Sequence, residues 1–141
     1  MEKEFTPRIT SFVCKWCTYT GADLAGIGRL QYPTSIIAMR VLCSSRIDPV
    51  FILKSYLKGA DGILIGGCHP GDCHYETGNY YTRRRFMILK SIFDSLGLKS
   101  DRLRLSWISA SEGGKFARVA NEFTEKIKKI GPSDTKRNMF L

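Results

Sequence analysis

Short apolar runs that are typical of strands alternate with helix-like segments along the whole chain, and this alternation restricts the fold more than any other feature. The clearest run, residues 62–67 (GILIGG), is apolar on both faces and bounded by glycine, which is typical of a buried parallel strand. Residues 9–14 and 35–43 predict two more strands, and residues 102–109 predict a fourth whose polar and apolar residues alternate. The chain therefore offers four strands to one sheet.

Helical signals occupy the intervals between these strands and the segment after the last one. Asp48 before Pro49 is typical of a helix N-terminus, because the carboxylate caps the first turn and proline suits the first helical position. Apolar residues recur at helical spacing over residues 86–96 and, most clearly, over 116–130. Residues 21–30 contain three glycines and predict at most a short helix.

The order βαβαβαβα predicts a single-domain α/β fold, a mainly parallel four-stranded sheet with helices on both faces, of the flavodoxin-like kind. A length of 141 residues suits one domain with its own core. We assign residues 1–132 to this domain and residues 133–141 to a polar C-terminal tail that ends in Phe140 and Leu141.

The charge and hydropathy of the chain restrict its surroundings. No run of about 18 apolar residues is present, and the N-terminus lacks the apolar core of a signal peptide, so a cytoplasmic protein is expected. The 22 Lys and Arg residues against 13 Asp and Glu residues give a net charge of +9, which fits an acidic partner surface. No nucleic-acid-binding motif accompanies this charge. Arg83, Arg84 and Arg85 are expected on an exposed helix start, in contact with a partner.

Five cysteines fall into three groups, and each group lies at or just past the end of a predicted strand. Cys14 and Cys17 form a CxxC motif after the first strand, Cys43 ends the second, and Cys68 and Cys73 follow the third. Open parallel sheets build their sites at the edge where the strands end, and neighbouring strands lie roughly 4.8 Å apart. We therefore expect the three groups to converge on one site.

Three kinds of chemistry compete for this site. An iron–sulfur cluster uses four thiolates, and zinc accepts four thiolates or three thiolates with a histidine, here His69 or His74. A redox dithiol needs only the CxxC motif and leaves Cys68 and Cys73 unexplained. The thiol count favours iron–sulfur, and the alternative is a structural zinc-binding interaction module.

Spacing suggests which four cysteines would hold the cluster. Cys68 and Cys73 flank a glycine-containing loop that can bend both sulfurs toward one iron, and Cys14 is fixed at a strand end. For the fourth position Cys17 is preferred because CxxC readily chelates a metal, and Cys43 competes with it. The predicted metal ligands are thus Cys14, Cys17, Cys68 and Cys73.

The chain resembles the delta subunit of methyl-viologen-reducing hydrogenases in five runs: CKWCTY (14–19), VLCSSRIDP (41–49), ADGILIGGCHPGDCHY (60–75), GNY (78–80) and SASEG (109–113). The resemblance covers nearly all of residues 8–131, and all five cysteine positions are filled.

The resemblance implies a 2Fe–2S electron-transfer subunit of methanogenic archaea. It would link the subunits of a nickel–iron hydrogenase, or a formate dehydrogenase, to the flavin-containing subunit of heterodisulfide reductase, where electron bifurcation takes place. The sequence contains no base–nucleophile pair, Walker loop or GxGxxG motif, so no catalytic residue is assigned and a non-catalytic subunit is expected.

Overall fold

The computed structural model describes residues 4–135 and contains one sheet of four parallel strands in the order β2-β1-β3-β4. The strands are β1 (Ile9–Cys14), β2 (Ile36–Val41), β3 (Gly62–Gly67) and β4 (Leu103–Trp107). The helices are α1 (Thr18–Ile27), α2 (Pro49–Leu57), α3 (Gly78–Ser95) and α4 (Gly113–Ile130). The strand order is that of the first four strands in the flavodoxin-like 2-1-3-4-5 arrangement. The predicted fold class is confirmed.

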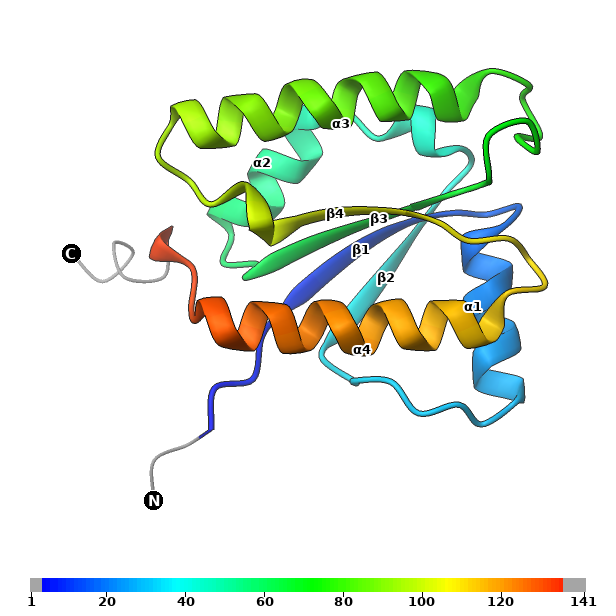
Figure 1. Ribbon diagram of the computed structural model, residues 1–141, viewed down its shortest axis with the longest axis horizontal. Coiled ribbons are helices and arrows are strands. Elements are labelled where there is room, and N and C mark those ends of the chain that lie inside the picture. Colours follow the sequence, from blue (N-terminus) through cyan, green and yellow to red (C-terminus); the bar gives the residue numbers. More distant parts are fainter. Residues whose placement is uncertain (1–3, 136–141) are drawn as a thin grey trace.

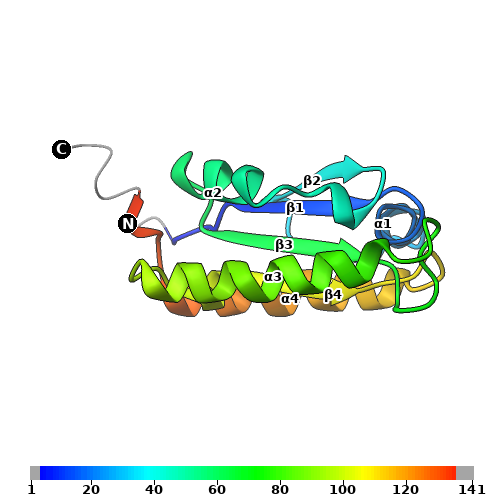
Figure 2. The ribbon, with the colours of Figure 1, turned by 90° about the horizontal axis from the view of Figure 1, so that it is seen from above.

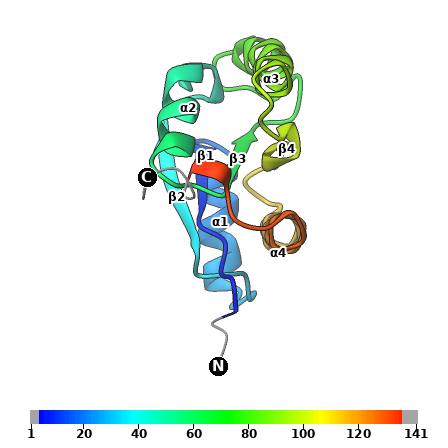
Figure 3. The ribbon, with the colours of Figure 1, turned by 90° about the vertical axis from the view of Figure 1, so that its left-hand side faces the viewer.

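Helices cover both faces of the sheet, with α2 and α3 on one side and α1 and α4 on the other (Figures 1 and 3). Successive residues of a strand point to opposite faces, so β1 and β3 each supply two cores. Ile9, Val13 and Leu64 pack against the α1 and α4 side, and Phe12 and Ile65 pack against the α2 and α3 side. This double burial explains why residues 62–67 are apolar on both faces.

Local signals in the sequence account for α2. The Asp48 carboxylate accepts a hydrogen bond of 2.8 Å from the Val50 backbone N–H, and Pro49 occupies the first helical position. The chain leaves the helix through Gly59, whose φ of 96° favours glycine.

None of the helices within residues 4–135 is long and apolar enough to cross a membrane.

Three helices begin earlier than the sequence predicts, and α4 does so at Gly113, three residues before its apolar stripe at 116–130. α1 begins at Thr18 rather than Gly21, and α3 begins at Gly78, eight residues before the apolar stripe. The expectation that residues 83–85 start a helix is therefore wrong, because they lie in its second turn. Their exposure is as predicted.

A buried arginine closes the edge of the sheet where the strands begin. Arg102 is 1% exposed, and its guanidinium donates hydrogen bonds of 2.9 Å to the carbonyl oxygens of Asp61, Gly131 and Pro132. The Asp61 carboxylate accepts hydrogen bonds from the backbone N–H groups of Arg8 (2.8 Å) and Ser133 (3.0 Å). These contacts fasten the chain after α4 to the segments that precede β1 and β3.

The first residues of the predicted tail lie against the domain. Ser133 is fully buried, and the Thr135 hydroxyl donates a 3.1 Å hydrogen bond to the carbonyl oxygen of Tyr56. Phe140 and Leu141 lie outside the described residues.

Candidate metal centre

The cysteines gather at the edge of the sheet where the parallel strands end. Figure 2 shows α1 at this edge, with the arrowheads of β2 and β3 pointing toward it. Cys14 is the last residue of β1, Cys17 immediately precedes α1, and Cys68 immediately follows β3. Cys43 lies just after β2, and Cys73 lies in the loop before α3. All five thiols are free, four of them are buried, and Cys73 is half-buried.

The sulfur atoms form two groups. The Sγ atom of Cys68 lies 2.8 Å from that of Cys17 and 3.8 Å from that of Cys14, and these three sulfurs lie within 4.8 Å of one another. We call them the three-thiol group. The Sγ atoms of Cys43 and Cys73 lie 3.8 Å apart and form the two-thiol pair. The sulfur contacts thus join Cys68 to the CxxC motif and Cys73 to Cys43, whereas the spacing predicted that Cys68 and Cys73 would face one iron.

Cys14 and Cys17 occupy different sides of the three-thiol group. The Cys14 thiol donates a hydrogen bond of 3.7 Å to the carbonyl oxygen of Leu42, so it lies on the side of Cys43. The Cys17 sulfur lies 3.7 Å from the Thr18 hydroxyl, which donates hydrogen bonds to the carbonyl oxygens of Gly67 (3.3 Å) and Ile108 (3.2 Å). Cys14 therefore lies toward the two-thiol pair, and Cys17 lies on the side of Thr18 and of a cavity that it lines with Trp16 and Cys68.

The three-thiol group loses one proton easily and the next two with difficulty. Hydrogen bonds from Cys17 and Cys68 lower the pKa of Cys14 to about 3. The shared hydrogen bond with Cys14 raises the pKa of Cys17 to about 11 and raises the pKa of Cys68 as well. Further thiolates require a compensating positive charge, which a metal centre supplies. Clustered buried thiols that need such a charge fit zinc and iron–sulfur chemistry.

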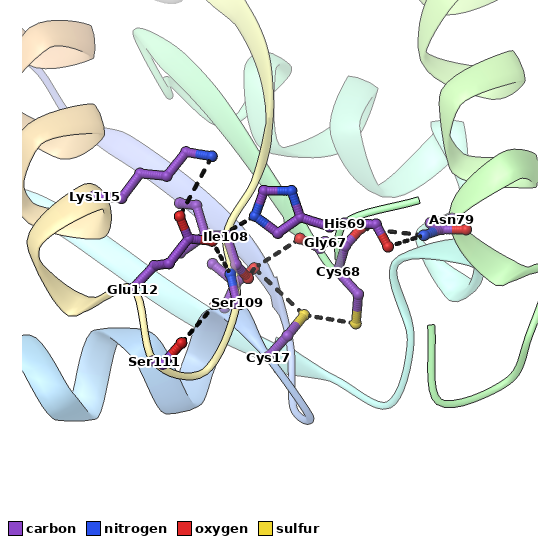
Figure 4. A network of polar contacts seen from close by, with 11 residues as sticks. Cys17, Gly67, Cys68, His69, Asn79, Ile108, Ser109, Ser111, Glu112 and Lys115 are labelled. Carbon is purple, nitrogen blue, oxygen red and sulfur yellow. Dashed lines mark hydrogen bonds and ion pairs between the residues drawn. The ribbon is translucent and has the colours of Figure 1, made fainter. Parts of the chain in front are cut away.

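Two side chains hold the Cys68–His69 segment from opposite directions (Figure 4). The Asn79 amide of α3 donates hydrogen bonds to the carbonyl oxygens of Cys68 (3.2 Å) and His69 (2.8 Å). On the other side, the Glu112 carboxylate bonds to the His69 ring and accepts a 3.0 Å hydrogen bond from the Ser109 backbone N–H. The Ser109 N–H and then the His69 ring lower the pKa of Glu112 to about 2, so the carboxylate remains charged.

Neither histidine belongs to the three-thiol group. The His69 ring is bound to Glu112, and the His74 ring stacks on Trp16 with centroids 3.8 Å apart. Within residues 4–135, the only set of three or more possible ligand side chains with all ligand atoms inside 4.8 Å is Cys14, Cys17 and Cys68. The arrangement gives no support to the predicted option of a histidine ligand.

Sequence reasoning assigned no role to Gly78, Asn79 or Glu112, although all three lie in the runs that carry the family resemblance. Gly78 is required because a Cβ atom there would lie 2.5 Å from the Cys43 sulfur and 3.1 Å from the Cys73 sulfur. The Gly78-Asn79 pair, which follows Cys73 closely in the sequence, was the signal that could have indicated a role for these residues beside the cysteines.

Replacing Gly78 with alanine is expected to lower the metal content of the purified protein severalfold. The added methyl group displaces the sulfurs of the two-thiol pair, even though alanine favours the helix. Gly114→Ala is the matched control: it also lies at a helix start, and nothing lies within 4 Å of the added Cβ. Metal analysis of both variants tests this; equal metal content would refute the steric role of Gly78.

Comparison with known proteins places the chain among subunits of hydrogenases. Residues 9–131 match the family "Methyl-viologen-reducing hydrogenase, delta subunit". The iron-sulfur subunit of the F420-non-reducing hydrogenase vhc of Methanococcus voltae is 54% identical over 138 residues, covering 98% of this chain and 96% of the relative. The iron-sulfur subunit of the F420-non-reducing hydrogenase of Archaeoglobus profundus is 49% identical over 132 residues, covering 94% and 96%.

A second kind of relative contains a similar domain inside a much longer chain. It is a subunit of the ferredoxin/F420H2-dependent CoB-CoM heterodisulfide reductase of Methanosarcina acetivorans. This relative is 45% identical over 130 residues, which cover 92% of this chain and 16% of the relative. The family match spans all four strands, all four helices up to Ile130 and all five cysteines. The chain belongs to the methyl-viologen-reducing hydrogenase delta subunit family.

Proposed function

We propose that this chain is a non-catalytic electron-transfer subunit that holds a 2Fe–2S cluster and passes electrons between larger partner proteins. The observation that carries the proposal is the gathering of five free thiols from three adjacent strand ends at one edge of the sheet. Four thiolates, two for each iron, are the ligands of such a cluster. When bound, the cluster would supply one-electron redox chemistry.

The proposed ligands are Cys14, Cys43, Cys68 and Cys73. Cys43 and Cys73 already form a pair, and Cys14 is the member of the three-thiol group that lies toward them. This choice replaces Cys17 of the sequence prediction with Cys43. Cys17 would not be a ligand, although its sulfur lies close to the Cys68 sulfur.

The surrounding residues position and shield the ligands. Asn79 and Glu112 fix the Cys68–His69 segment between α3 and α4, so the Cys68 sulfur is held in place before metal arrives. Cys14, Cys43 and Cys68 are each less than 5% exposed, which limits contact between the sulfurs and water. Cys73 is the half-buried member of the set. A largely buried, fixed set of thiolates suits electron transfer because little has to rearrange when the charge changes.

The relatives suggest the partners. Close relatives are named as iron-sulfur subunits of hydrogenases, and a similar domain lies within a subunit of heterodisulfide reductase. We propose that a hydrogenase, or a formate dehydrogenase, delivers electrons through this chain to the flavin-containing subunit of heterodisulfide reductase for electron bifurcation in methanogenesis. A cytoplasmic location, where thiols stay reduced, is part of this proposal.

The test is anaerobic purification followed by metal analysis and spectroscopy. The expected protein is brown, contains about two irons and two sulfides per chain, and gives a 2Fe–2S electron paramagnetic resonance signal after reduction. A colourless protein that contains one zinc per chain would refute the electron-transfer proposal.

A structural zinc site is the second candidate, and one observation favours it. The three sulfurs within 4.8 Å of one another can hold a single tetrahedral metal ion that takes its fourth ligand from elsewhere. In that case the chain would be an interaction module without redox chemistry. The two candidates require different cysteines, a difference that substitution can measure.

A further inference from the structure

The loops that carry the cysteines also expose aromatic, apolar and basic side chains. Trp16, between the two cysteines of the CxxC motif, is 43% exposed; Leu42, just before Cys43, is 60% exposed; and Tyr75, two residues after Cys73, is 47% exposed. We define the rim patch as these residues with their neighbours in space: Lys15, Trp16, Leu42, Arg46, His74 and Tyr75.

Contacts show that the rim patch is continuous. The Trp16 indole stacks on His74 and donates a 3.4 Å hydrogen bond to the Tyr75 hydroxyl, and the Lys15 ammonium lies 5.0 Å from the Trp16 ring centre. Tyr75 in turn shares a cavity of about 180 Å³ with other residues of the patch and its border: Leu42, Cys43, Ser45 and Arg46. The patch therefore spans the two sulfur groups from the CxxC loop to the loop after β2.

The charge of this region favours an acidic partner. Lys15 and Arg46 belong to the patch, and the Arg85 guanidinium joins its border through a hydrogen bond to the Ser45 carbonyl oxygen. Among residues 4–135, none of these three cations has a carboxylate within ion-pair distance. Asp72 and Glu76 lie in the same loop region and only partly offset them. A second copy of a chain with charge +9 would be repelled.

We propose that the rim patch is the docking surface for a redox partner protein whose contact surface is acidic around an apolar centre. Exposed Trp, Tyr and Arg side chains are the residues that dominate binding energy in protein interfaces. Because the patch residues adjoin the cysteines in sequence, docking here brings the partner next to the thiol ligands. This inference rests on the proposed function and specifies which surface that function uses.

The test uses two patch variants, Leu42→Ser and Arg46→Glu, each with a matched control at the opposite edge of the sheet. Leu57→Ser changes a leucine of similar exposure, 63%, at the end of α2, and Lys99→Glu reverses an exposed charge before β4. Binding of the cluster-loaded chain is measured against the purified hydrogenase and against the purified flavin-containing subunit of heterodisulfide reductase, both from the same organism, at low and high salt. Absorption and electron paramagnetic resonance spectra establish that each variant keeps its cluster.

Each patch variant is expected to bind at least one of the two proteins about tenfold more weakly or worse, while both controls bind normally. The Arg46→Glu loss should shrink at high salt because charge attraction is screened. Unchanged binding by both patch variants would overturn the proposal, as would a wild-type chain that dimerises and becomes monomeric with Leu42→Ser. A cluster-loaded wild-type chain that binds neither protein would refute the proposed partners and this surface together, whereas the patch-variant result refutes the surface alone.

Discussion

Serine in place of Cys43 or Cys73 is expected to abolish the 2Fe–2S electron paramagnetic resonance signal of the reduced chain, whereas serine in place of Cys17 should leave it. The first two sulfurs form the two-thiol pair at 3.8 Å, and losing either leaves one iron with a single cysteine ligand. Cys17 lies beside the Thr18 hydroxyl, and within residues 4–135 its sulfur makes no hydrogen-bond contact with either member of the two-thiol pair. Quantified spectra of anaerobically reconstituted variants measure the effect.

The opposite pattern would identify a single metal ion in the three-thiol group. That centre would be lost with Cys17→Ser and retained with Cys43→Ser and Cys73→Ser, because it uses only the three sulfurs within 4.8 Å. Far-ultraviolet circular dichroism of each variant provides the control for folding. If each of the five single cysteine-to-serine substitutions abolishes the signal, the proposal that four cysteines bind the cluster and Cys17 does not is wrong.

Replacing Arg102 with methionine is expected to lower the free energy of unfolding by about 3 kcal/mol or more. The substitution keeps the apolar stem but removes the three hydrogen bonds that the buried guanidinium donates to the carbonyl oxygens of Asp61, Gly131 and Pro132. Anaerobic urea denaturation followed by circular dichroism measures the change.

Arg104→Met is the matched control for this substitution. Arg104 lies two residues after Arg102, within β4, and forms a partly exposed ion pair of 3.0 Å with Glu122, which contributes about 1 kcal/mol or less. If Arg102→Met lowers the free energy of unfolding no more than Arg104→Met does, the buried hydrogen bonds of Arg102 do not stabilise the fold as predicted.

The sequence predicted the elements whose inner faces are apolar and missed the starts of helices whose inner faces are polar. α2 and α4 pack apolar stripes on the sheet, and their signals were clear. In the first turns of α3, however, the inward residues are Asn79 and Thr82, which bond to the Cys68 carbonyl and the Ser44 hydroxyl. Thr18, at the start of α1, is likewise a polar residue on the inner face, and its hydroxyl donates a hydrogen bond to the Gly67 carbonyl oxygen. Apolar periodicity fails there because these turns hold the cysteine loops instead of filling the core.

The convergence of the cysteines could be predicted, but their division into two groups could not. Strand order alone brings the ends of β2, β1 and β3 together, and the sequence indicated each strand. The direction of each sulfur depends on the path of the loop after β3, which is set by Asn79, by Glu112 and by the space that Gly78 leaves. Asn79 and Glu112 lie 10 and 43 residues beyond His69, a range that spacing arguments do not cover.

The central position of β1 also determines when the thiols can first meet as the chain folds. Cys14 and Cys68 are 54 residues apart, and they approach only after β1 has paired with β3, a long-range step that is slow relative to helix formation. Pairing of β1 with β2 is likewise needed to bring in Cys43. Until both pairings are complete, the five thiols are not assembled, so the proposed cluster could gain all four of its cysteine ligands only after the sheet has formed.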